Sequence, residues 1–124
     1  GRANSEGVDF SDAEVVQTLE VYVQQTPLMP AERILLDEAQ LLRILDIADQ
    51  AFEKWRKVPV EERAKCLENL GAALQQNMLA LINLLVQEAH KTLKDAVAEI
   101  REAIDFCYYY AQQARHYQSD PFIL

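Results

Sequence analysis

The chain has 124 residues, 50% of them hydrophobic and 26% charged, a composition typical of one small globular domain rather than of a disordered tail. Its net charge is −8 at pH 7, which argues against a nucleic-acid-binding surface because phosphate contacts need a basic face. No apolar run reaches the roughly 18 residues of a membrane span, no signal peptide opens the chain, and two cysteines make no disulfide framework, so we expect a cytoplasmic protein.

The first 30 residues predict a linker followed by a short helix. Residues 1–10 contain Gly, Asn, Ser and mixed charges, which are typical of a linker. Ser11 and Glu14 have the spacing of a capping box, with Phe10 and Val15 in the positions of a hydrophobic staple. The helix should end near residue 25, because two prolines follow within residues 26–30.

The second predicted helix begins at Asp37, where Gln40 completes another capping box. Its apolar residues recur at spacings of three and four, which places them on one helical face: Leu41, Leu45, Ala48, Phe52 and Trp55.

The third predicted helix begins at about Pro59, since proline suits the first turn of a helix, and runs without a break to about Ala89. Its apolar stripe consists of Leu67, Leu70, Leu74, Met78, Leu81 and Leu85. Residues 78–86 are apolar almost all round, so we expect this part to be buried on several sides.

His90 follows this helix at a position where a left-handed residue commonly ends a helix, a conformation that His tolerates better than most residues do. Thr92 and Asp95 then begin a fourth helix that should end near Tyr117. Its narrow apolar seam consists of Val97, Ile100, Ile104, Cys107, Ala111 and Ala114. Because few residues join the two long helices, we expect an all-α chain of three to four helices, dominated by a long antiparallel helical hairpin.

Few side chains suggest chemistry by their spacing alone. The two histidines and two cysteines lack the spacing of a zinc site, and Cys107 on the seam is most simply a core residue. Three successive tyrosines, 108–110, cannot share one helical face, so at least one should be exposed or meet another domain. Glu102 lies near the edge of the seam, and its position in the sequence alone favours a solvated carboxylate at the rim of the helix.

Residues 88–110, EAHKTLKDAVAEIREAIDFCYYY, resemble a segment of the aldehyde dehydrogenase superfamily. The resemblance is closest to the pyrroline-5-carboxylate dehydrogenase half of the bifunctional proline utilisation A family, where a glycine stands in place of His90. Weaker motifs follow the same order along the chain. They are Gly1-Arg2 with Asn4-Ser5-x-Gly7-x-Asp9, Ala51-Phe52-x-x-Trp55, and Pro59-x-x-Glu62-Arg63.

The resemblance implies a division of the chain into an interdomain linker (1–10), a short helix with a proline-containing break (11–30), and the N-terminal helical part of an α/β aldehyde dehydrogenase domain (31–124). It also implies NAD-dependent oxidation of glutamate semialdehyde to glutamate by the intact dehydrogenase half, and FAD in the proline dehydrogenase half. In this family a glutamate at the position of Glu102 borders the aldehyde site near the substrate amino group. A carboxylate facing an ammonium group makes a charge-assisted hydrogen bond.

The chain also departs from the family. Residues 26–36 leave no room for the strand pair that usually precedes the second helix, so either the chain is shortened or residues are missing there. The family's catalytic cysteine and glutamate would lie beyond Leu124, and no glycine-rich nucleotide-binding turn is present. We therefore expect an inactive fragment with no catalytic, cofactor or metal residues of its own, whose partner is the rest of the parent enzyme.

Two alternatives remain open. A stand-alone helical interaction module would explain the apolar surface of residues 78–86 and the tyrosine run, and a homo-oligomer could form through an exposed apolar helix face. A metal or redox protein has only the two histidines and two cysteines in its favour.

Overall fold

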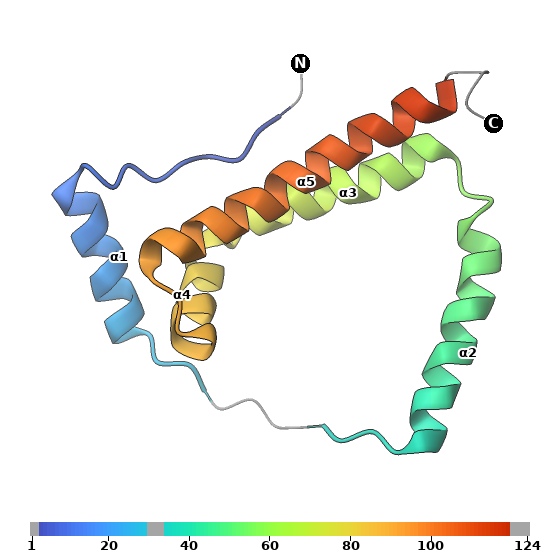
Figure 1. Cartoon of the computed structure of the whole chain (residues 1–124), viewed down its shortest axis with the longest axis horizontal. Helices are drawn as coiled ribbons and strands as arrows, with labels where there is room; N and C mark the ends of the chain where they lie inside the picture. The colour runs from blue at the N-terminus through green and yellow to red at the C-terminus, as the bar shows by residue number, and fades with distance from the viewer. Residues whose placement is uncertain (1–2, 30–33, 120–124) are drawn as a thin grey trace.

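The computed structural model describes residues 3–29 and 34–119. Four residues used above lie outside these ranges: Gly1, Arg2, Leu124 and Pro30, the second proline of residues 26–30. Within these ranges the chain forms helices and no strand, which confirms the predicted all-α class. The helices, shown in Figure 1, are α1 (Ala13–Gln25), α2 (Glu38–Trp55), α3 (Val60–Gln76), α4 (Met78–Ala89) and α5 (Leu93–Ser119).

Helices α3 and α5 form the predicted antiparallel hairpin and lie side by side along most of their length (Figure 1). Small residues on α3 allow this close approach, because Ala64 and Gly71 are buried. A Cβ atom added to Gly71 would lie 3.1 Å from Cζ of Tyr108 and 3.3 Å from Cβ of Cys107. The α3 face against α5 therefore includes small residues as well as leucines: Leu74 of the predicted stripe packs against the buried cluster, whereas Leu70 is 49% exposed.

The prediction of one continuous helix from residue 59 to residue 89 is wrong, because the helix breaks at Asn77. Asn77 has φ −101° and ψ 15°, and its side-chain Nδ2 donates to the carbonyl of Ala73 at 2.8 Å. Asparagine competes with the helix backbone in this way, which disfavours it inside helices. Helix α4 consequently points away from the axis of α3 (Figure 1).

The turn at Asn77 lets α4 pack between α5 and α1. Leu19 of α1 and Ile82 of α4 belong to one buried cluster with Val97, Ile100 and Ile104 of α5. The apolar surface of residues 78–86 is thus largely covered by the chain itself, although Leu79 and Leu84 are partly exposed.

Four local signals predicted where helices begin or end, at Ser11, Asp37, His90 and Thr92. The structure confirms the last three. The amide of Gln40 donates to Asp37 at 2.7 Å and the amide of Asp37 to Gln40 Oε1 at 2.9 Å, which confirms that capping box. His90 has φ 53° and ψ 35°, as predicted for a left-handed helix end. The amide of Asp95 donates to Thr92 Oγ1 at 3.1 Å.

The predicted N-cap of the first helix is wrong by one residue. Asp12 caps α1, since its carboxylate accepts from the amide of Glu14 at 2.9 Å. The Ser11 hydroxyl instead donates to Asp9 Oδ1 at 2.6 Å. Asp and Ser are about equally favourable N-caps, so the sequence alone does not show which of the two neighbouring residues caps the helix.

Helix α2 contributes no buried residue and lies apart from the hairpin (Figure 1). Its predicted apolar face exists, but it is open: Leu45 and Phe52 are each 56% exposed and Trp55 is 44% exposed. None of the described helices is long and apolar enough to cross a membrane.

Candidate substrate-contact site on helix α5

Glu102 projects from the outer side of α5. Residues of an α-helix turn by about 100° each, so Glu102 lies about 200° from Ile104, which is fully buried. Its side chain is exposed, and the residue belongs to the solvent-facing side of the hairpin. The structure therefore agrees that Glu102 is a solvated carboxylate, but places it on the side of α5 opposite Ile104 rather than at the edge of the apolar seam.

Glu102 is distinguished from the other acidic residues of α5 by its lack of a partner. Helix α5 carries four carboxylates, and within the described part of the chain Glu102 makes no hydrogen bond or ion pair. The other three are engaged: Asp95 accepts from Thr92 Oγ1 at 2.8 Å, Glu99 pairs with Lys91, and Asp105 accepts from the amide of Ser5 at 2.8 Å. A carboxylate without an internal partner is available to an external cation.

Exposed aromatic rings follow Glu102 along the same side of the helix. Phe106, one turn further on, is 49% exposed, and Tyr110 is 55% exposed. The ring centroids of Phe106 and Tyr110 are 5.8 Å apart, and Tyr109 meets Tyr110 edge-to-face at 5.2 Å. Tyr108, by contrast, is half-buried against the α3–α5 contact, so the three tyrosines diverge as predicted.

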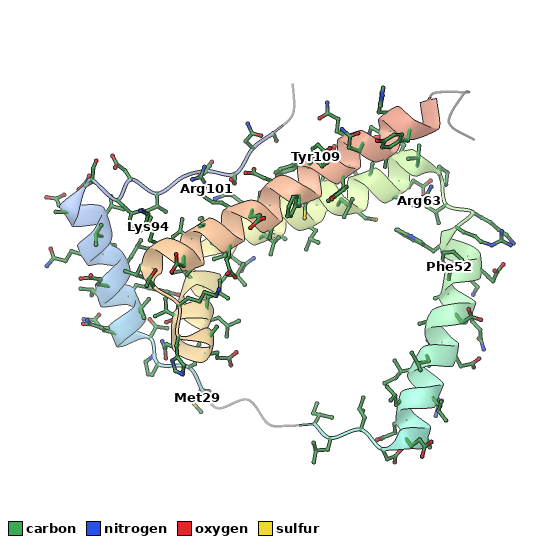
Figure 2. All side chains as sticks on the ribbon, viewed as in Figure 1. Met29, Phe52, Arg63, Lys94, Arg101 and Tyr109 are labelled. Atoms are coloured by element: carbon green, nitrogen blue, oxygen red, sulfur yellow. The ribbon has the colours of Figure 1, made fainter. Side chains whose placement is uncertain are left out.

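The N-terminal segment 3–10 lies along the neighbouring side of α5. Arg101 Nε donates to the Ser5 hydroxyl at 3.3 Å, and the amide of Glu6 donates to Gln75 Oε1 at 2.9 Å. Figure 2 shows Arg101 between α5 and this segment. These contacts leave the outer side of α5, which carries Glu102, uncovered by the N-terminal segment.

Among the described residues, no group of three or more His, Cys, Asp or Glu side chains could hold a metal ion. Cys66 is exposed, whereas Cys107 is buried in the seam as predicted, and burial raises the pKa of its thiol.

A separate hollow of about 790 Å³ lies at the C-terminal end of α2. Its walls include Ile47, Phe52, Trp55 and Val58, and none of its lining residues belongs to α5. The lining is mainly apolar with one cation, Lys54, so it offers an apolar surface rather than a reactive site.

The sequence pointed to Glu102 and to the tyrosine run as separate features, and did not connect the exposed rings of Phe106 and Tyr110 with Glu102. The signal was present, since an aromatic residue four positions after a carboxylate lies next to it on a helix. The contact of Ser5 with Asp105 left no such signal, because 100 residues separate the two.

Comparison with known proteins shows where similar chains occur. Residues 11–123 match the aldehyde dehydrogenase family. The chain is 41% identical over 78 residues to the bifunctional protein PutA of Salmonella typhimurium, a match that covers 63% of this chain and 6% of that protein. It is 42% identical over 71 residues to 1-pyrroline-5-carboxylate dehydrogenase 1 of Halalkalibacterium halodurans, covering 57% of this chain and 14% of that protein.

A solved structure extends this similarity to the fold. The crystal structure of a bifunctional proline utilization A protein superposes with a TM-score of 0.88 at 33% identity. The superposition covers 96% of this chain and 12% of that one, so the chain corresponds to a small part of its relatives. Because the family match spans nearly the whole sequence, the chain belongs to the aldehyde dehydrogenase family.

Proposed function

We propose that this chain forms one wall of the aldehyde site in a larger, bifunctional enzyme of proline catabolism. The enzyme would oxidise glutamate semialdehyde to glutamate in the cytoplasm, passing a hydride from the hydrated or enzyme-bound aldehyde carbon to NAD. A second half of the same protein would carry FAD. The names of the two relatives support this reading, since one is a bifunctional PutA protein and the other a pyrroline-5-carboxylate dehydrogenase.

Within that site we assign Glu102 the role of contacting the substrate ammonium group. The observation that carries this assignment is the absence of an internal partner for Glu102, when every other carboxylate of α5 has one. A charge-assisted hydrogen bond from the ammonium to this carboxylate would favour amino aldehydes over aldehydes without an amino group.

The 124-residue chain alone should bind the aldehyde weakly and should not oxidise it. Its sequence contains no glycine-rich nucleotide-binding turn, and neither cysteine has a histidine close to it in the sequence that could activate it. Purified chain mixed with NAD and glutamate semialdehyde should show no increase in NADH absorbance. Sustained turnover would contradict this part of the proposal.

Substitution of Glu102 in the full-length enzyme tests the substrate contact. Glu102→Gln should lower kcat/KM for glutamate semialdehyde by about 10- to 100-fold, the scale of a hydrogen bond to a charged group. It should leave kcat/KM for 5-oxopentanoate, which lacks the amino group, nearly unchanged. Glu99→Gln is the matched control, because Glu99 lies one turn away but pairs with Lys91. Equal losses for both aldehydes would rule out the contact.

The second candidate function, a stand-alone helical interaction module, is favoured by the open apolar face of α2. The two candidates differ in the gene sequence downstream of Leu124. A nucleotide-binding fold and a catalytic cysteine encoded there would support the enzyme, whereas a stop codon would support the module.

A further inference from the structure

The exposed aromatic rings beside Glu102 have no role in the hairpin core. Phe106 is 49% exposed, and it belongs neither to the buried cluster nor to the hydrophobic residues packed against that cluster. Side chains four residues apart on a helix have Cβ atoms about 5–6 Å apart. A small cation held by the Glu102 carboxylate would therefore lie within reach of the Phe106 ring.

We propose that Phe106 is a specificity-determining residue of this site, whose ring contacts the substrate ammonium group through a cation–π interaction while Glu102 balances its charge. The inference rests on the proposed function and adds to it a second recognition element. An ammonium group within about 6 Å of a ring centroid is attracted by the negative face of the ring. A carboxylate accepts hydrogen bonds from neutral donors as well as from cations, whereas the face of an aromatic ring attracts a cation. The two groups together would therefore select a cation better than the carboxylate alone.

The neighbouring tyrosines hold the Phe106 ring in place. Tyr110 packs against it with centroids 5.8 Å apart and an interplanar angle of 38°, and Tyr109 in turn meets Tyr110 edge-to-face. Such aromatic contacts restrict the ring before any ligand arrives, so less side-chain entropy is lost on binding.

The test compares aromatic and aliphatic side chains at position 106 in the full-length enzyme. Phe106→Leu keeps an apolar side chain but removes the ring, whereas Phe106→Trp keeps an aromatic face that binds cations at least as well. The measured quantity is the ratio of kcat/KM for glutamate semialdehyde to that for 5-oxopentanoate. Phe106→Leu should lower this ratio about 5- to 30-fold, and Phe106→Trp should retain most of it.

Binding of the product gives a readout that does not depend on turnover. Inhibition by glutamate should weaken in Phe106→Leu by a similar factor, while inhibition by glutarate, which has no amino group, should hardly change. Phe52→Leu on α2 is the control, because Phe52 is 56% exposed, close to the 49% of Phe106, but lies on another helix. Thermal unfolding of each variant checks that the fold is unchanged.

The outcomes separate this inference from the proposed function. If Glu102→Gln lowers the ratio and Phe106→Leu does not, the role of Phe106 is overturned and that of Glu102 stands. If neither lowers it, both are overturned. If the two variants lower the ratio and the double variant loses less than the product of the two effects, the residues act on one ammonium group, as proposed.

Discussion

His90 shows how one residue can end a helix at some cost. Its left-handed conformation, φ 53°, is strained for residues with a Cβ atom, and glycine adopts it freely. His90→Gly should therefore raise the free energy of unfolding of the chain by about 0.5–1 kcal/mol, as measured by urea denaturation.

The control for His90 lies one position earlier, inside the helix. Ala89→Gly should lower the free energy of unfolding by up to about 1 kcal/mol, because glycine is unfavourable within a helix. Loss of stability in both variants would show that the left-handed conformation of His90 does not destabilise the chain.

Gly71 is the residue on which the spacing of the hairpin depends. A larger side chain there would meet Tyr108 and Cys107, so Gly71→Leu should destabilise the chain by about 1–3 kcal/mol through overpacking. Ala73→Leu, at an exposed position of the same helix, should change stability little. Melting temperatures of the two variants give the comparison, and equal values would mean that α3 and α5 can separate without cost.

At the scale of elements, two amide side chains of α4 hold the end of α1. Asn83 is buried, and its Nδ2 donates to the carbonyl of Thr26 at 2.8 Å. Gln87 Nε2 donates to the same carbonyl at 2.8 Å and to that of Val23 at 3.1 Å. These bonds satisfy carbonyls that the last turn of a helix leaves without intrahelical partners.

Replacement of Asn83 should loosen α1 more than the rest of the chain. Asn83→Leu keeps the volume but removes the donor, which should cost about 1–3 kcal/mol and speed hydrogen exchange in α1. Asn69→Leu on the exposed side of α3 is the control. Unaltered exchange in α1 with unaltered stability would show that these amides do not secure the helix.

An ion cluster links α3 to the C-terminal part of α5 and makes the stability of the hairpin depend on pH. Arg115 donates to Glu61 at 2.7 Å and to Glu68 at 2.6 Å (side-chain nitrogen to carboxylate oxygen). The hydrogen bonds from Arg115 lower the pKa of both carboxyl groups from the ordinary value of 4.5. Their contribution is therefore present above about pH 4.5 and is lost as the pH falls through the lowered values.

Arg115→Gln should consequently reduce the difference in melting temperature between pH 6 and pH 3. As the pH falls through the lowered pKa values of the two carboxyl groups and they become protonated, the melting temperatures of variant and parent should converge. Arg56→Gln, which removes an exposed ion pair with Glu53 within α2, should leave the pH dependence nearly unchanged. Parallel pH curves for parent and Arg115→Gln would show that the cluster is fully screened by solvent.

At the scale of the whole molecule, α2 presents an apolar face that the rest of the described chain does not bury. Its large exposed apolar side chains are Leu41, Leu42, Ile44, Leu45, Ile47, Phe52 and Trp55. An open patch of this kind favours association, because burying apolar surface yields about 25 cal/mol per Å². The expected homo-oligomer would thus form through α2 rather than through residues 78–86.

The purified chain should therefore associate with itself as its concentration is raised. Leu41→Lys together with Leu45→Lys should return it to a monomer in light-scattering measurements, because two charges would be buried in the contact. Val21→Lys, on the partly exposed side of α1, should leave the association unchanged. A monomer at all concentrations would show that α2 does not drive association.

Much of the fold could be read from local signals, because these depend on neighbours in the sequence. The capping box at Asp37, the left-handed end at His90 and the period of the α5 seam each arise within about one or two helical turns. The position of Glu102 outside that seam follows from the same period. Its role depends on the resemblance to relatives and stays a prediction.

Tertiary structure decided what local signals leave open. The sequence predicts one apolar face for α2 and burial on several sides for α4. The structure covers α4 with α1 and α5 but leaves the face of α2 open, because burial depends on which helices meet. The contact of Ser5 with Asp105 and the cap that Asn83 provides for α1 join residues far apart in the chain. The periodicity of a helix shows which side chains share a face, whereas only the packing of helices shows which faces are covered and which carboxylate, here Glu102, is left without a partner.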